Sequence, residues 1–470
     1  MLKYKEGRQD LSDCTKLDGA VHVDEGSTGK ILFNYTWPIL LSQIIQEMYN
    51  VADCAVVGRF AGALALAAAG TAALPMSVAV NFFVGFSSGI STMSSALFGS
   101  RDHDRLRELI SSIMKMTFIC GILLSVLIFA ISPGYLSYTR VPGDVSPYAL
   151  IYLRICSLGV CAQLVNNMVT ALLRSVGDSS SPMKLFAVSA LVNVVGDVFL
   201  VVVMKKGVAG AAAATAFSQW LLSVMLLIRL KRLDPGISIM NAKGSSGSRD
   251  MFTALGRGIP AGLQALFMSI SSILIRFHIN GFGSAAIAGM NVFARIEGLC
   301  YLPSFAFGIA LTAFVGQNMG AKKPERIRDC VRMSVKAMIL IMIPLSLALC
   351  LGAPALSLIF TTDEGVIANA VEAVRYTLPL YVFYAVNQVY LGAVKGMGNT
   401  FYPMICTLVC YALFRVGWCG VLLKTFVTMR VVYLSYAVSF LLMFIMIMPV
   451  YRASLNRNIR EASLKAEMEI

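Results

Sequence analysis

Long apolar runs separated by short polar segments extend along most of the chain, from Ile31 to Tyr451. About 18 or more apolar residues with few charges are enough for one helix to cross a bilayer. The runs are continuously apolar and do not alternate with a period of two, which excludes an outer-membrane β-barrel. The pattern predicts an all-α polytopic membrane protein with twelve transmembrane helices, over residues 31–57, 64–98, 110–133, 148–173, 182–204, 207–230, 255–281, 285–316, 331–359, 368–394, 401–424 and 427–451.

A polar stretch after the sixth predicted helix divides the chain into two halves. It contains the sequence GSSGSRD, which is typical of a linker. The first thirty residues are polar and charged, so they lack the apolar core of a cleavable signal peptide. The predicted organisation is an N-terminal tail (1–30), an N-terminal six-helix lobe (31–230), a linker (231–254), a C-terminal six-helix lobe (255–451) and a C-terminal tail (452–470).

The two halves repeat one another at an offset of 221 residues, which aligns GSRDHDRLREL with GAKKPERIRDC. The same shift pairs Arg154 with Arg375, Asn166 with Asn387, Arg174 with Lys395, Gly177 with Gly398, and Pro182 with Pro403. Because each half contains an even number of helices, both repeats have the same orientation in the membrane. Two parallel bundles of this kind predict a pseudo-symmetric pair of lobes with a cleft between them near the bilayer midplane.

Composition and charge support this prediction and add an orientation. The chain is 57% hydrophobic and 14% charged, whereas soluble domains average about 25% charged residues. The net charge of +14 comes from basic residues scattered among short loops, so we expect no nucleic-acid partner. With the N-terminus inside, 26 Lys and Arg residues lie on the inner side and 6 on the outer side. By the positive-inside rule, both termini and the linker are predicted to be cytoplasmic.

Sequence signatures of enzymes and cofactor sites are missing. The string GSTGK at residues 26–30 lacks the spacing of a phosphate-binding loop and follows no strand. The three histidines are far apart in sequence, and the cysteines lie mostly inside apolar runs without CxxC spacing. We therefore predict that the protein is not an enzyme and has no cofactor. A cleft between two lobes is the expected substrate site of a transporter, and without an ATP site its transport would be driven by an ion gradient.

Ionisable residues inside apolar spans are costly and are functional candidates by default. Asp53 lies in the first predicted helix and Asp197 in the fifth, with Asn193 four residues before Asp197 and therefore on the same helical face. Thr215 lies in the small-residue run GAAAATAFSQ of the sixth helix. If these three helices meet, two carboxylates, an amide and a hydroxyl form a cation-binding site. Its oxygen ligands suit Na⁺, and a buried carboxylate pair also favours binding of one H⁺.

The second half has no copy of this carboxylate pair, since Trp418 stands at the position equivalent to Asp197. Ion coupling is therefore predicted in the N-terminal lobe. Glu297 follows Arg295 by two residues, so we interpret its charge as neutralised by that arginine. A structural role is therefore favoured for Glu297. Other residues are candidates for lining the cleft or for bending helices. They indicate function less specifically than the aspartates do, because such residues are common in membrane helices. The candidates for lining the cleft are Glu47, Asn166 and Glu297, and those for bending helices are Pro38 and Pro260.

Several motifs resemble those of the multidrug and toxic compound extrusion (MATE) transporters. They are PILLSQIIQEMYNVADCAVVGRFAG at residues 38–62, VGQNMGAKKPERI at 315–327, and the paired RSVGDSSSP and KGMGNTFYP loops. The resemblance covers about residues 31–451. It implies two pseudo-symmetric six-helix lobes, and export of cationic or amphipathic compounds by alternating access in exchange for H⁺ or Na⁺. It also implies a multi-pass protein of the prokaryotic inner membrane, which we expect to be a monomer.

Within that family, the pattern is most similar to the prokaryotic DinF-like branch. The ion site of that branch, two Asp, one Asn and one Thr, maps onto Asp53, Asp197, Asn193 and Thr215. The other prokaryotic branch carries acids in the seventh and tenth helices, and this chain has none in the corresponding stretches GIPAGLQALFMSISSILI and YTLPLYVFYAVNQVYL.

Two alternatives from other classes remain. A lipid-linked oligosaccharide flippase has the same general fold, but its diphosphate would require a strongly cationic cavity. A polytopic membrane enzyme would need a catalytic constellation near one interface, and the sequence contains none that we recognise.

Overall fold

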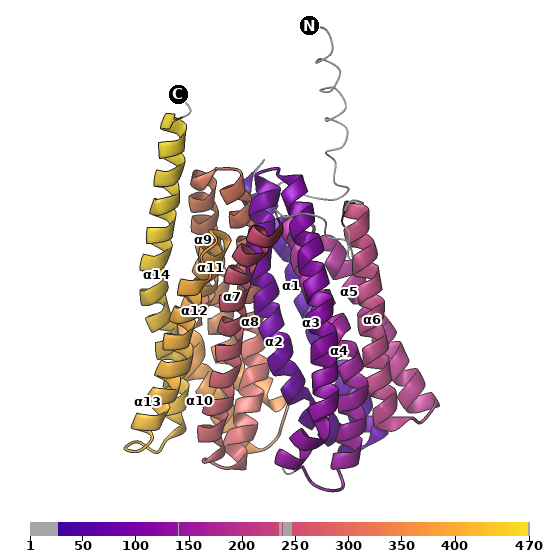
Figure 1. Cartoon of the computed structure of the whole chain (residues 1–470). Coiled ribbons are helices and arrows are strands. Elements are labelled where there is room, and N and C mark those ends of the chain that lie inside the picture. Colours follow the sequence, from indigo (N-terminus) through magenta and orange to yellow (C-terminus); the bar gives the residue numbers. More distant parts are fainter. Residues whose placement is uncertain (1–26, 140, 235–236, 238–246, 469–470) are drawn as a thin grey trace.

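A computed structural model describes residues 27–139, 141–234, 237 and 247–468, and every regular element in these ranges is a helix (Figure 1). The N-terminal lobe consists of α1 (Thr28–Val56), α2 (Ala63–Gly99), α3 (His103–Tyr138), α4 (Ser146–Ser175), α5 (Ser180–Asp197) and α6 (Gly207–Leu233). The C-terminal lobe consists of α7 (Gly247–Asn280), α8 (Ser284–Gly320), α9 (Pro324–Leu358), α10 (Glu364–Thr377), α11 (Tyr381–Gly396), α12 (Phe401–Thr407), α13 (Arg415–Leu422) and α14 (Met429–Met468).

These helices correspond to the twelve predicted spans, so the predicted all-α two-lobe fold is confirmed. A short 3₁₀ turn at Leu378–Leu380 joins α10 to α11, and a π-helical segment at Leu408–Phe414 joins α12 to α13. Ten helices in the described ranges are long and apolar enough to cross a membrane on their own. The other two spans are α1, which carries more polar residues, and the α10–α11 pair, which the turn at Pro379 divides into two shorter helices.

The last helix is longer than predicted. α14 continues through residues 452–468, where the sequence predicts a separate tail. This stretch contains no Gly or Pro, and an ion pair of 2.8 Å between Arg457 and Glu461 connects successive turns. The predicted N-terminal tail lies outside the described residues except for positions 27–30. The predicted linker is shorter than expected, because α6 continues to Leu233 and α7 begins at Gly247, and residues 235–236 and 238–246 between them lie outside the described residues.

The backbone itself repeats at the predicted offset. Six of the eight residues with left-handed φ in the described chain form pairs 221 positions apart: Gly62 and Gly283 (both 90°), Arg101 and Lys322 (60° and 56°), and Gly177 and Gly398 (93° and 84°). The other two, Lys205 and Gly207 between α5 and α6, have no such counterpart. A positive φ is uncommon and is strained for residues with a Cβ. Its recurrence at three equivalent connections shows that the two halves turn from helix to helix in the same way.

Contacts between the lobes are tightest at the end of the molecule where α1 begins and α14 ends (Figure 1). There α2 lies against α7. It also crosses α8 at Gly99 of α2 and Gly320 of α8, and each of these glycines faces the backbone of the other helix. A Cβ atom at Gly99 would lie 2.0 Å from the carbonyl oxygen of Gln317, and one at Gly320 would lie 1.9 Å from that of Ala96. These two contacts are equivalent under the repeat, so a near-twofold glycine contact closes the lobes at this end.

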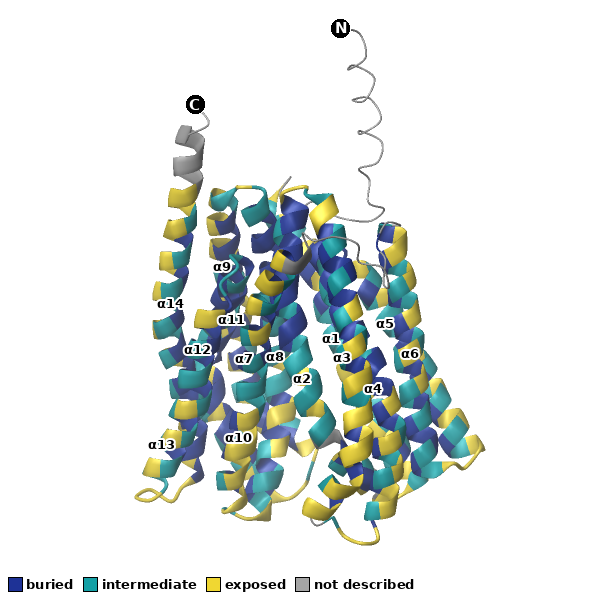
Figure 2. Ribbon diagram, viewed as in Figure 1, coloured by how far each residue is buried: buried dark blue, intermediate teal, exposed yellow. Residues whose placement is uncertain are grey.

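The flanks of the molecule have the surface that a bilayer requires. Large apolar side chains are exposed along the outer faces of helices such as α3 and α9, as the yellow segments of Figure 2 show. The buried clusters lie inside the two lobes, and the first turns of α1 also pack into the core of the C-terminal lobe through Leu32, Tyr35 and Ile39. α1 therefore belongs to one lobe by sequence and contacts both.

Candidate functional site

The two predicted aspartates meet inside the N-terminal lobe. Asp53 lies in the last turn of α1, just before a π-helical segment at Val57–Ala61, and Asp197 ends α5, just before another at Val198–Val203. π-helical turns widen a helix and occur frequently at functional sites. The two carboxyl groups lie within hydrogen-bonding reach of each other. Asp197 is 0% exposed and Asp53 is partly buried.

Asn193 and Thr215 complete the cluster that the sequence predicted. Asn193 is 1% exposed, and Thr215 lies on α6 directly across from it. In the amide orientation that satisfies its neighbours, Asn193 donates from Nδ2 to Oδ2 of Asp197 at 2.9 Å and accepts from the backbone N–H of Thr215 at 3.3 Å. In the opposite orientation its Nδ2 lies 3.5 Å from Oγ1 of Thr215. Both orientations connect α5 to α6 at this point.

The carboxylate pair lacks a positive partner within the described parts of the chain. No Lys or Arg acts on either carboxylate, and Oδ1 of both Asp53 and Asp197 is buried without a hydrogen-bond partner. Two buried carboxylates in contact are unstable unless a cation or a proton neutralises them. The cluster therefore has the chemistry of a site for H⁺ or for a small cation with hard oxygen ligands.

Three further residues of the cluster were missed from the sequence. The hydroxyl of Tyr49 on α1 lies close to the Thr215 side chain, and Tyr152 and Cys156 on α4 lie close enough to interact electrostatically with Asp53. Tyr49 precedes Asp53 by four residues, so the helical spacing that identified Asn193 would also have identified it. No comparable signal in the sequence connects α4 to this site.

Asn166 does not line the cleft, which corrects one of the sequence predictions. Its Nδ2 donates to the backbone oxygen and to Oε1 of Gln219 at 3.0 and 2.9 Å, and its Oδ1 accepts from Ser223 Oγ at 2.7 Å. It therefore connects α4 to α6 inside the N-terminal lobe. The next residue, Asn167, lines the central cavity instead, and its Nδ2 is buried without a partner.

Glu297 is not among the residues that line the central cavity, and the arginine beside it is not Arg295. It lies inside the C-terminal lobe, close enough to the guanidinium of Arg415 to interact electrostatically with it. Arg415 donates to Ser439 Oγ at 2.7 Å, and its guanidinium lies over three aromatic rings, at 4.4 Å from the centre of Tyr436 in the closest case. This arrangement supports a structural role for Glu297, but with a different counter-charge from the one predicted.

Glu47 and the two prolines lie in places compatible with their predicted roles. Glu47 is exposed on α1 and lies close enough to interact electrostatically with Tyr301, a residue of the central cavity. Pro38 and Pro260 lie inside the continuous helices α1 and α7. Gly258, two residues before Pro260, packs against α2, since a Cβ there would lie 2.8 Å from the ring of Phe86. Whether either proline bends its helix during transport stays a prediction.

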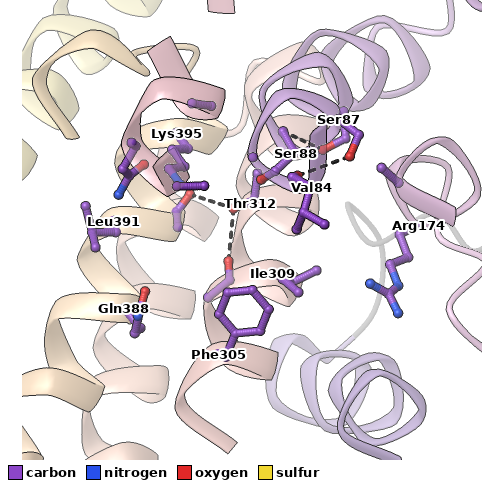
Figure 3. Close-up of a pocket in the computed structure, with 18 of the residues that line it drawn as sticks. Val84, Ser87, Ser88, Arg174, Phe305, Ile309, Thr312, Gln388, Leu391 and Lys395 are labelled. Atoms are coloured by element: carbon purple, nitrogen blue, oxygen red, sulfur yellow. Dashed lines mark hydrogen bonds between the residues drawn. The ribbon is translucent and has the colours of Figure 1, made fainter. Parts of the chain in front are cut away.

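A central cavity of about 180 Å³ lies between the lobes, lined by α2 and α4 from one side and by α7, α8 and α11 from the other. Its volume is many times the roughly 15 Å³ that one water requires. Two cationic side chains face it, Arg174 at the end of α4 and Lys395 at the end of α11, and they are equivalent under the repeat (Figure 3). No Asp or Glu from the described part of the chain lines it. Nε of Arg174 is buried without a hydrogen-bond acceptor in the described structure.

Comparison with known proteins gives a consistent result. The family model MatE matches residues 38–199 and 260–419, one segment in each lobe. The chain is 23% identical over 378 residues to the probable multidrug resistance protein YoeA of Bacillus subtilis, covering 79% of this chain and 82% of that protein. It is 24% identical over 349 residues to an FAD transporter of Shewanella oneidensis, covering 72% and 76%. A crystal structure of MATE in the bent conformation superposes with a TM-score of 0.87 at 21% identity, covering 94% of this chain and 98% of the other.

Proposed function

The chain belongs to the MatE family of membrane transporters and is not an enzyme; from this premise we propose that it is a secondary antiporter that exports cationic or amphipathic small molecules in exchange for H⁺ or Na⁺. The observation that carries the proposal is the buried Asp53–Asp197 pair, which no Lys or Arg of the described chain neutralises. Such a pair binds a cation from one side of the membrane and releases it on the other when its access changes.

α1 provides a physical connection between the ion site and the cavity. One end of this helix carries Asp53, and near the other end the hydroxyl of Tyr35 donates to the backbone oxygen of Arg174 at the cavity. Neutralisation of the aspartates changes how favourably this end of α1 packs beside α5. A shift of α1 would then move the end of α4 that carries Arg174. Ion and substrate binding would thereby be linked, and linkage requires each ligand to alter the affinity of the other by the same factor.

The proposed location is the inner membrane of a prokaryote, with both termini in the cytoplasm. The charge asymmetry of the loops supports this orientation. The first turn of α1 and the end of α14 lie on the same side of the molecule, as an even number of spans requires (Figure 1). In this orientation the glycine contact between α2 and α8 closes the cytoplasmic side.

Purified protein in sealed proteoliposomes tests the proposal. A pH gradient and a Na⁺ gradient are imposed separately, and movement of a fluorescent amphipathic dye is followed with and without an ionophore that collapses each gradient. We expect dye to move against its own gradient with one of the two ions, and the ionophore to stop this movement. Dye movement that only follows its own gradient under both conditions would show that the protein is not an antiporter.

A second candidate function, export of an anionic amphiphile, is favoured by the charge of the cavity. Arg174 and Lys395 are its only charged lining residues within the described chain, and attraction between opposite charges is strong in a poorly screened site. This arrangement is less suited to a cationic drug than to a carboxylate or phosphate. The relative from Shewanella oneidensis, named as a transporter of the anion FAD, supports the same direction. The flippase alternative, which requires a cationic cavity, also gains support.

The two candidate functions make opposite predictions for the double variant Arg174→Gln/Lys395→Gln. If the substrate is anionic, uptake of a sulfonated dye into inverted vesicles should fall about tenfold or more, because two attractive charges are lost. Uptake of cationic ethidium should be unchanged or higher. Gln388→Ala, at a neutral residue of the same cavity, is the matched control and should affect both dyes alike. Equal losses for both dyes in the double variant would refute selection by these charges.

A further inference from the structure

A second cavity lies on the outside of the C-terminal lobe, at the same end of the molecule as the glycine contact. It is a groove of about 610 Å³ between the first turns of α9 and the final part of α14, with Tyr390 of α11 at its base. It shares no lining residue with the central cavity. Its charged lining residues are all cationic, and they are Arg328, Arg332, Lys336 and Arg452.

The charged side chains that line this groove are all of one sign. Arg328, Arg332 and Lys336 follow one another at intervals of four residues, so they lie on one face of α9. Like charges at this spacing destabilise a helix. Arg452 faces them from α14, and in the described chain none of the four forms an ion pair or donates to a carboxylate. Glu325 and Asp329 lie three residues before Arg328 and Arg332 on α9, but no acid of the described chain lines the groove beside the four cations.

The groove lies where the apolar part of each helix begins. α9 carries no charged residue from position 337 to its end, and α14 carries none from 431 to 451. Lys336 and Arg452 are therefore the first charges outside the hydrocarbon region on these two helices, at the level of the lipid headgroups, and Arg332 and Arg328 follow about one and two turns further out on α9. The same helix faces continue into the membrane with exposed apolar residues, Leu340 (77% exposed) four positions after Lys336 and Ile445 (59% exposed) seven positions before Arg452.

The base of the groove offers further polar and apolar contacts. The rings of Tyr390 and Tyr451 pack with their centres 5.0 Å apart. Tyr451 lies close enough to interact electrostatically with Arg328 and Arg332, and Tyr390 does so with Arg452. Val335 and Met448 complete an apolar wall beside them. A ligand in this groove would meet cations at one level and an apolar surface below it.

We propose that this groove binds the phosphate headgroup of an anionic phospholipid, with its acyl chains lying along the exposed apolar faces of α9 and α14. Basic pockets between membrane helices on the cytoplasmic side bind such headgroups. The phosphate would neutralise the row of cations and connect α9, α11 and α14 of the C-terminal lobe. Free phosphate offers the same anionic group, but it makes no use of the apolar surface that continues the groove into the membrane.

Lipid titration of the full-length protein in detergent tests this proposal. Thermal unfolding is measured with phosphatidylglycerol, with phosphatidylcholine of the same chain length, and with inorganic phosphate at matched ionic strength, and native mass spectrometry counts the lipids bound to folded protein. We expect phosphatidylglycerol to raise the unfolding midpoint and to remain bound, and phosphatidylcholine to do neither. Equal effects of the two lipids would overturn the proposal. An effect of inorganic phosphate equal to that of phosphatidylglycerol would identify a phosphate site that is not a lipid site.

The variant Arg332→Gln/Arg452→Gln removes one cation from each side of the groove. Both side chains are exposed, so folding should be retained, and the apparent affinity for phosphatidylglycerol should fall about 10- to 30-fold. Lys231→Gln/Arg232→Gln removes the same charge from the exposed last turn of α6 in the other lobe and should leave the affinity near that of the wild type. An equal loss in both variants would mean that lipid binding reflects only overall charge.

Discussion

Replacing Asp197 by Asn is expected to abolish gradient-driven export, with a loss of at least about 100-fold in the initial rate, because every transport cycle requires the carboxylate pair to bind and release a cation. The amide has nearly the shape of the carboxylate and keeps an oxygen that can accept from Asn193 Nδ2, now 2.9 Å from Oδ2. Packing should therefore survive while the charge change is lost. The measurement is substrate movement in proteoliposomes under an imposed pH or Na⁺ gradient.

The thermal stability of this variant distinguishes loss of coupling from loss of folding. A buried carboxylate without a counter-ion destabilises the protein, so Asp197→Asn should unfold at the wild-type temperature or above it. Glu297→Gln is the matched control in the other lobe, because it neutralises a partly buried acid that interacts electrostatically with Arg415. It should reduce export less and leave the response to the ion gradient intact. Equal loss of coupling in both variants would contradict the assignment of the ion site to the N-terminal lobe.

Replacing Gly320 by Ala is expected to reduce the transport rate about tenfold or more. The added methyl group should prevent the two lobes from closing at the end of the molecule where α1 begins. The added Cβ would lie 1.9 Å from the carbonyl oxygen of Ala96 and 2.7 Å from the backbone nitrogen of Ser100. Neither backbone atom can move without shifting α2. Overpacking of this kind costs about 1–3 kcal/mol, which changes an equilibrium between two lobe arrangements by roughly 5- to 150-fold.

Chemical labelling of Cys54 reports which of the two arrangements of the lobes is populated. It is the exposed cysteine among those described, and it lies on α1 close enough to Arg295 of α8 to interact electrostatically with it. In the wild type it should react from outside intact cells with an impermeant maleimide, once Cys14 is replaced by Ser. Gly320→Ala should lower this labelling as the equilibrium shifts. Labelling of the wild type only in inverted vesicles would show that the predicted orientation is wrong.

Gly352→Ala provides the control for helix propensity. A Cβ at Gly352 would have only the Leu356 side chain within 4 Å, at 3.9 Å, so this substitution adds the same methyl group without a clash. Replacing Gly by Ala inside a helix is otherwise stabilising by roughly 0.5–1 kcal/mol. Gly352→Ala should therefore transport at the wild-type rate. If Gly320→Ala matches it in both rate and Cys54 labelling, the close approach of α2 and α8 is not required for transport.

The sequence by itself determined the spans, the duplication and the pair of aspartates. Each of these depends on properties that a residue has before it packs. A run of apolar residues enters a bilayer whatever surrounds it, and a carboxylate inside such a run is costly whatever lies beside it. Asn193 followed from Asp197 by helical spacing, and Tyr49 follows from Asp53 by the same rule. Left-handed residues recur at Gly62 and Gly283 because the repeated sequence turns in the same way.

The tertiary structure alone decided which side chains face one another across helices. Asn166 and Asn167 are neighbours in sequence, yet one connects two helices of a lobe and the other faces the cavity. Arg415, and not Arg295, is the arginine that interacts electrostatically with Glu297. From the sequence, Arg174 and Lys395 are simply two of the positive charges on the cytoplasmic side. They face one cavity only because the two lobes pack together. Such choices depend on the rotation of each helix about its axis, which many weak contacts between helices set together and no local pattern encodes.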